Sequence, residues 1–143
     1  MPDVQHSVAR SRGSTGPTDY QVAIRCGRHA ITADEPAIRG GGDAGPSPYE
    51  LVLAGLVACT AMTLRMYAQR KDWNLARVSV ECHLVKQADT AHIRRRLRLE
   101  GELAPGNIAR LLEIAERTPV TLTLKNGLEI RTEIEPDGDP EPS

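Results

Sequence analysis

Residues 45–62 read Gly45-Pro-Ser-Pro-Tyr-Glu-Leu-Val-Leu-Ala-Gly-Leu-Val-Ala-Cys-Thr-Ala-Met62, a helix start signal followed by an apolar run. Ser47 can act as the N-cap, Pro48 suits the first helical position, and Glu50 stands three residues after Ser47, where it closes a capping box. Because the run is apolar on every side of a helix, we expect this helix to be buried all round. Cys59 lies about two and a half turns into the helix, among small residues, and is a candidate for thiol redox chemistry.

Short alternating segments precede this helix. Apolar and polar residues alternate over residues 20–26, Gly27-Arg28 suits a two-residue turn, and residues 29–33 would return the chain, so these residues predict a hairpin. Residues 4–12 are a weaker strand candidate. The glycine-rich residues 36–46 predict a long flexible connection to the helix, which we expect to end at Arg70 or Lys71.

Two longer alternating segments follow the helix. Residues 78–84 and 93–103 predict antiparallel strands with one solvated face, although Arg95 falls on the apolar face, against the pattern. Residues 108–115 have helical spacing, and their helix should end before Pro119. Residues 120–134 predict a terminal hairpin that turns at Asn126-Gly127.

The composition excludes several classes of protein. A chain of 143 residues suits one domain. The net charge of −1, with no Phe, one Trp and three Tyr, leaves no stacking platform for bases, so nucleic-acid binding is not expected. The N-terminus has no signal peptide and the longest unbroken apolar run, residues 51–59, is too short to span a bilayer, so we expect a soluble, cytoplasmic protein. Residues 1–3 and the acidic, proline-rich residues 135–143 should be disordered.

Three cysteines, at positions 26, 59 and 82, have no metal-ligand spacing and in a reducing compartment are expected to be free thiols. Taken without further context, each is also compatible with an ordinary small core residue. His29, His83 and His92 likewise lack metal spacing and suit solvated positions. The arginines at 94, 95, 96 and 98 could bind an anion or could form a solvated strand face paired with acidic neighbours.

The order of the motifs resembles a known family. Gly-x-x-Gly-Pro-Ser-Pro-x-Glu-Leu leads into Ala-Cys-Thr-Ala-Met, and after paired strands comes Leu-Leu-Glu-Ile-Ala-Glu-Arg-x-Pro-Val; over residues 20–134 this series resembles the OsmC/Ohr family of thiol-dependent hydroperoxide reductases. The resemblance implies an α+β fold, with antiparallel sheets around a long central cysteine-bearing helix and an intertwined homodimer with active sites at the interface. It also implies a single OsmC-like domain over residues 1–143, with its core at about residues 4–134.

The family's site residues carry over only in part. Cys59 matches the peroxidatic cysteine, and Arg39 falls where OsmC-type members carry the arginine that stabilises the thiolate by lowering its pKa. Arg12, near the position used by Ohr-type members, ranks second. The glutamate that positions the arginine is replaced by Tyr49, whose hydroxyl could bond a guanidinium. Glu50 follows one residue later and suits the capping box better.

The family's resolving cysteine is replaced by Thr118. The resemblance therefore implies a one-cysteine peroxidase that reduces organic hydroperoxides through Cys59, with an external thiol or dithiol reductant and no metal or cofactor. An apolar collar from Leu51, Leu56 and Met62 would favour alkyl or lipid peroxides. The alternative is a non-catalytic dimer of the same fold that binds a small apolar or thiol-bearing ligand.

Overall fold

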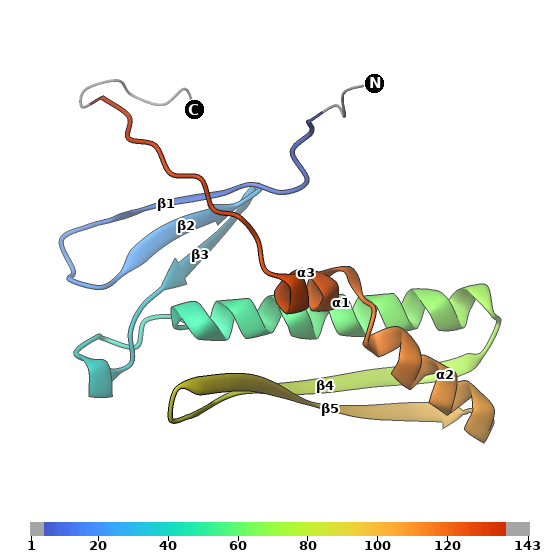
Figure 1. Cartoon of the computed structure of the whole chain (residues 1–143). Coiled ribbons are helices and arrows are strands. Elements are labelled where there is room, and N and C mark those ends of the chain that lie inside the picture. The colour runs from blue at the N-terminus through green and yellow to red at the C-terminus, as the bar shows by residue number, and fades with distance from the viewer. Residues whose placement is uncertain (1–4, 137–143) are drawn as a thin grey trace.

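A computed structural model describes residues 5–136, so the expectations for residues 1–3 and for residues 137–143 of the acidic tail lie outside the described residues. The chain forms two antiparallel sheets and three α-helices (Figure 1). In chain order the elements are β1 (Ser11–Thr15), β2 (Val22–Cys26), β3 (His29–Ala33), the 3-10 helix η1 (Ala37–Arg39), α1 (Pro48–Arg70), β4 (Asn74–Gln87), β5 (Thr90–Glu102), α2 (Pro105–Ala115) and α3 (Pro119–Asn126).

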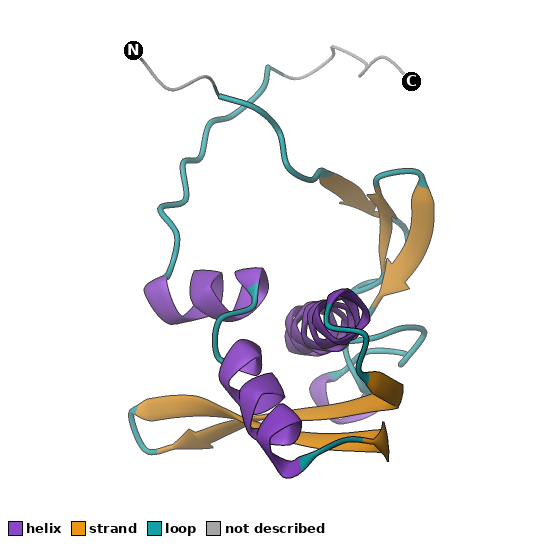
Figure 2. Cartoon of the chain, turned by 90° about the vertical axis from the view of Figure 1, so that its right-hand side faces the viewer, coloured by secondary structure: helices purple, strands orange, loops and turns teal. Residues whose placement is uncertain are grey.

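Helix α1 runs through the middle of the molecule. It packs along the β4–β5 hairpin and contacts α2 and α3, while the three-stranded sheet β1-β2-β3 lies near its N-terminal part, on the side away from β4–β5 (Figures 1 and 2). The α+β class and the long helix with antiparallel sheets agree with the prediction from sequence.

The predicted capping box starts α1. The Ser47 side chain accepts from the Glu50 backbone N–H (3.4 Å), and the Glu50 carboxylate accepts from the Ser47 N–H (3.0 Å). Two backbone donors that a helix start leaves unpaired are thereby satisfied. The helix ends at Arg70, as predicted.

Helix α1 is not buried all round within one protomer. A stripe of four residues spaced by one turn is buried, consisting of Leu56, Thr60, Leu64 and Ala68. Other large apolar residues of α1 are exposed, among them Val52 (46% exposed), Met62 (59%) and Met66 (53%). The expectation of complete burial is therefore wrong for the single chain, because β4, β5, α2 and α3 cover only one side of α1.

The core forms where the buried stripe meets β4 and α2. Its buried members are Leu64, Ala68, Leu75, Leu111 and Ala115, and Trp73 and Tyr67 pack against it. By length and composition alone, α1 is the one helix in residues 5–136 that could cross a membrane, a test that the core helix of a soluble protein also passes.

The two hairpins form as the sequence pattern predicted, whereas the first strand lies later in the chain than predicted. The β2–β3 hairpin pairs Cys26 with His29 and turns through Gly27, whose φ of 61° suits the left-handed region. The long β4–β5 hairpin also forms as predicted. The first strand, however, is Ser11–Thr15 and not residues 4–12, because its position is set by pairing with β2 and not by its own polar sequence.

The predicted terminal hairpin is wrong. Residues 119–126 form α3, which Thr118 caps by accepting from the Thr121 N–H and which Pro119 begins at the first helical position. Gly127 ends it, and residues 128–136 contain no helix or strand. An alternating run that begins with Thr-Pro fits both a strand and a capped helix. In the structure the helix cap prevails over the alternation.

Candidate functional site

Cys59 lies on α1 beside the buried stripe and is half-buried. Its Sγ is 3.9 Å from the Thr63 hydroxyl, one turn further along the helix. The next residue, Thr60, is fully buried and points toward β5 and α3. All three cysteines are free thiols.

Arg39 ends η1, in the connection before α1. Its guanidinium is 3.9 Å from the Glu35 carboxylate and its side chain is 68% exposed. Within the described protomer, Arg39 makes no hydrogen bond or ion pair with Cys59. An exposed pair at this distance holds an arginine weakly, so Arg39 is not fixed in place by Glu35.

The connection that carries Arg39 is more ordered than its glycine content predicted. The Asp34 side chain, 2% exposed, accepts from the backbone N–H groups of Glu35 (2.8 Å), Gly42 (3.2 Å) and Ala44 (3.0 Å). At Gly45, a Cβ would collide with the Thr32 carbonyl. The expectation of a flexible connection is therefore wrong, because a buried carboxylate organises its turns.

Tyr49 and Glu50 lie in the first turn of α1, ten and nine residues before Cys59. Arg12 is in β1. The Tyr49 ring, with the residue 53% exposed, lies 5.2 Å from the Lys86 ammonium and not against an arginine. Glu50 closes the capping box, and the hydrogen bonds from Ser47 lower the pKa of its carboxyl.

Thr118, at the position of the missing resolving cysteine, is fully buried at the N-cap of α3. Its hydroxyl oxygen is 2.6 Å from that of Thr121 and accepts from the Thr121 backbone N–H (3.3 Å). The hydroxyl is thus occupied within its own turn.

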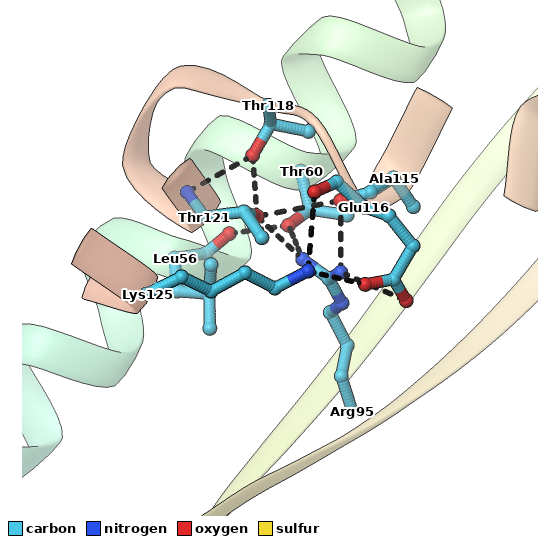
Figure 3. A network of polar contacts seen from close by, with 8 residues as sticks. All are labelled: Leu56, Thr60, Arg95, Ala115, Glu116, Thr118, Thr121 and Lys125. Atoms are coloured by element: carbon cyan, nitrogen blue, oxygen red, sulfur yellow. Dashed lines mark hydrogen bonds and ion pairs between the residues drawn. The ribbon is translucent and has the colours of Figure 1, made fainter. Parts of the chain in front are cut away.

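Arg95 connects these parts of the molecule (Figure 3). One guanidinium nitrogen donates to the hydroxyls of Thr60 (3.0 Å) and Thr121 (2.9 Å), and the other donates to the Ala115 carbonyl (2.8 Å) at the end of α2. The Glu116 carboxylate lies 3.9 Å away and also pairs with Lys125 at 2.8 Å. The position of Arg95 on the apolar face of β5, which the sequence pattern did not explain, follows from this set of acceptors.

A cavity of about 560 Å³ opens beside this network. Leu56, Ile93 and Leu124 give it apolar walls, and Arg95 and Lys125 give it cationic ones. Across the hairpin, Cys82 pairs with Arg95. Burial raises the pKa of the Cys82 thiol, and the Arg95 charge opposes that rise. No group of three or more His, Cys, Asp or Glu in the described part of the chain is placed to hold a metal ion.

Residues 40–133 match the family described as OsmC-like protein. This chain belongs to the OsmC-like family. Solved structures agree with that assignment, and because each is less than 25% identical the likeness shows the fold. An OsmC-like protein from Mycoplasma pneumoniae is 16% identical with a TM-score of 0.70, over 85% of this chain and 89% of that one.

Several of the similar structures carry a functional name. The organic hydroperoxide resistance protein OsmC from Legionella pneumophila is 18% identical, with a TM-score of 0.65 over 85% of this chain and 92% of that one. The organic hydroperoxide resistance protein OhrB of Bacillus subtilis is 21% identical, with a TM-score of 0.58 over 84% and 93%. No curated protein matches the sequence.

Sequence reasoning about this OsmC-like protein missed two organising residues. Asp34 gave no signal, because an isolated acidic residue at a strand end is common. Arg95 did give one, since a charged residue on the apolar face of a strand must find partners when the strand is covered. What those partners are depends on α1, α2 and α3, which are far away in sequence.

Proposed function

We propose that this OsmC-like protein is a thiol-dependent peroxidase that reduces organic hydroperoxides through Cys59. The observation that carries the proposal is the placement of Cys59, the only one of the three thiols on α1, half-buried beside exposed apolar side chains of that helix. The family, and neighbours named for organic hydroperoxide resistance, support a role of this kind.

The proposed reaction needs no metal. The Cys59 thiolate attacks one peroxide oxygen, the O–O bond breaks, and the leaving alkoxide takes a proton to become an alcohol, so that Cys59 is oxidised to sulfenic acid. A first external thiol then forms a mixed disulfide with Cys59 and releases water. A second external thiol displaces Cys59 as thiolate and leaves as the external disulfide. Thr118 cannot take the place of the first thiol, because a hydroxyl forms no disulfide.

Arg39 is proposed to support the Cys59 thiolate, from the same protomer or from a second copy. Its weak, exposed pair with Glu35 leaves the side chain able to turn. Leu51, Leu56 and Met62 are proposed to form the apolar collar. Leu56 faces the cavity and is 4% exposed, whereas Met62 is 59% exposed in one protomer and would need a second chain to enclose a substrate.

We also propose that the protein is a homodimer. The exposed Val52, Met62 and Met66 of α1 form an apolar surface, and its exposure to water is unfavourable. An obligate interface of this kind buries on the order of 2,000 Å² or more. Sedimentation at micromolar concentration should give a dimer, and a folded monomer would contradict the proposal.

The function is tested by the rate of Cys59 sulfenic acid formation with cumene hydroperoxide and with hydrogen peroxide. We expect the organic peroxide to react faster, and Cys59→Ser to abolish the reaction while Cys82→Ala, as the matched control, leaves it intact. Equal loss in both variants would contradict the assignment of Cys59.

The second candidate is a non-catalytic dimer that binds a small apolar or thiol-bearing ligand. It is favoured by the positions of the two residues that depart from the family, since Tyr49 contacts Lys86 and the Thr118 hydroxyl is engaged by Thr121. A folded protein in which no hydroperoxide oxidises Cys59 would select this candidate.

A further inference from the structure

Arg95 is a largely covered cation in contact with three helices. Its side chain is 12% exposed, and its donors reach Thr60 on α1, the Ala115 carbonyl at the end of α2 and Thr121 on α3. A guanidinium presents its donors in a rigid planar fork, so it can serve several fixed acceptors at once. A lysine ammonium is a compact point charge on a flexible stem and cannot reach all of them.

The hydroxyls around Arg95 form a network with a definite direction. Thr60 donates to the Leu56 carbonyl (2.7 Å) and so accepts from Arg95. Thr121 can donate to the Ala115 carbonyl (3.3 Å), which leaves its oxygen to accept from Arg95 and from the Thr118 hydroxyl. This assignment gives every hydroxyl proton an acceptor. No buried side-chain nitrogen or oxygen among the described residues lacks a partner.

The network joins the turn that carries the proposed reacting thiol to the turn that carries Thr118. Thr60 is the residue after Cys59, and Thr121 bonds Thr118 at the resolving position. Helices α1 and α3 also pack against each other, but in residues 5–136 the side-chain hydrogen bonds that link α1 to the Thr118–Thr121 turn all run through the Arg95 guanidinium (Figure 3).

We propose that Arg95 is a positioning residue of the thiol site, which holds the Thr118–Thr121 turn against the Cys59 turn of α1. The inference rests on the proposed function in one respect, because it takes Cys59 as the reacting thiol. Arg95 acts through Thr60 and Thr121 and need not touch the substrate. Its loss frees the turn at position 118 to move away from α1.

The position of the turn is measured with a thiol reporter. In a protein carrying Thr118→Cys, Cys26→Ser and Cys82→Ala, the two remaining thiols are equilibrated with oxidised and reduced glutathione. For each disulfide that forms, the two protein thiols together lose two protons and two electrons, which reduce one oxidised glutathione to two molecules of glutathione. The equilibrium gives the effective concentration of one thiol for the other, which depends on their relative position.

Arg95→Lys should lower this effective concentration about tenfold or more, the scale set by losing hydrogen bonds to a charged group. Arg96→Lys is the matched control on the same strand, and it should change the value less than about twofold because Arg96 makes none of the bonds to Thr60, Thr121 or Ala115. Thr121→Val keeps Arg95 but removes the hydroxyl through which Arg95 holds the turn at position 118. This substitution should also lower the effective concentration. It also serves if Arg95→Lys does not fold.

Two results would overturn the inference. The first is that the folded Arg95→Lys or Thr121→Val protein has the same effective concentration as the Arg96→Lys protein. Such a variant would differ only in a lower melting temperature, as expected if the hydrogen bonds are purely structural. The other is the absence of any internal disulfide while Arg95 is intact. Neither outcome involves peroxide, so failure of this inference is distinguishable from failure of the peroxidase proposal, which depends on Cys59 oxidation in the unsubstituted chain.

Discussion

At the scale of single residues, the three thiols differ through their surroundings. Cys59 lies on α1 near exposed apolar side chains, whereas Cys82 lies on β4 opposite Arg95. Burial disfavours the thiolate of Cys82, and the neighbouring guanidinium only partly offsets that effect. Being opposite an arginine in register therefore does not by itself make Cys82 a strong nucleophile.

Cys82 should react slowly with iodoacetamide near neutral pH in the folded protein and rapidly in denaturant. Its raised pKa keeps it protonated, so labelling should begin only at higher pH than for an unburied thiol. By linkage, its contribution to stability is present below the unfolded pKa and is lost as pH rises through the folded pKa. Arg95→Gln should raise the pKa of Cys82 further, because the opposing charge is removed; a fall would show that the Arg95 charge does not oppose the rise.

Oxidation of Cys59 should give no internal disulfide. After one equivalent of cumene hydroperoxide, intact-mass spectrometry should show addition of oxygen at Cys59, advancing to sulfinic acid with excess peroxide unless a small thiol is present. Thr118→Cys should instead give an internal disulfide, provided the two Cα atoms come within about 7 Å. An internal Cys59 disulfide in the unsubstituted protein would refute the one-cysteine mechanism.

At the scale of elements, the connection between β3 and α1 depends on Asp34. Its carboxylate satisfies three backbone N–H groups that would otherwise be unpaired. Arg39, on η1 within this connection, can take part in chemistry only if the connection keeps its shape.

Asp34→Ala should destabilise the protein by about 1–3 kcal/mol, the cost of leaving buried donors unsatisfied. It should also slow Cys59 oxidation if Arg39 acts on Cys59, and Arg39→Ala should slow it without a comparable loss of stability, because Arg39 is exposed. Denaturant unfolding and peroxide kinetics measure both effects. Asp43→Asn, in the same connection but exposed, is the control and should change neither.

The N-terminus of α1 should respond to acid through Glu50. The hydrogen bonds from Ser47 lower the pKa of its carboxyl, so the folded state favours the charged form. The stabilisation is present above the unfolded pKa and is lost as pH falls through the folded pKa. The melting temperature of the unsubstituted protein should exceed that of Glu50→Gln near neutral pH and converge with it in acid. A constant difference across this range would contradict the assignment.

At the scale of the whole molecule, one protomer leaves apolar surface uncovered. Met62 and Met66 on α1 are exposed, and in the segment after α3 Leu128, Ile130 and Ile134 are 74%, 87% and 95% exposed. The alternation in residues 128–134, which predicted a strand, has no partner strand among residues 5–136. A second copy is the simplest cover for both surfaces.

The double substitution Met62→Glu and Met66→Glu should shift the protein toward the monomer at micromolar concentration in sedimentation, since charges are costly in an apolar interface. Gln87→Glu, exposed at the end of β4 and not on α1, is the control and should leave the assembly unchanged. A dimer that tolerates the methionine substitutions would place the interface elsewhere.

Sequence alone determined the features that depend on neighbours within a few residues. The capping box of Ser47 and Glu50, the end of α1 at Arg70, the β2–β3 turn at Gly27 and the end of α2 before Pro119 all follow from local backbone preferences. The motif order also predicted the family, and with it Cys59 as the candidate thiol.

Tertiary structure decided the features that need partners distant in sequence. Which side of α1 is buried depends on where β4 and α2 pack, and α3 forms in place of a strand because its cap and its contacts with α1 are available in the folded chain. Arg95 lies 35 residues from Thr60 and 26 from Thr121, so no local pattern could show that it joins them. A charged residue on an apolar strand face indicates that it must have polar partners, but only the fold shows which residues they are.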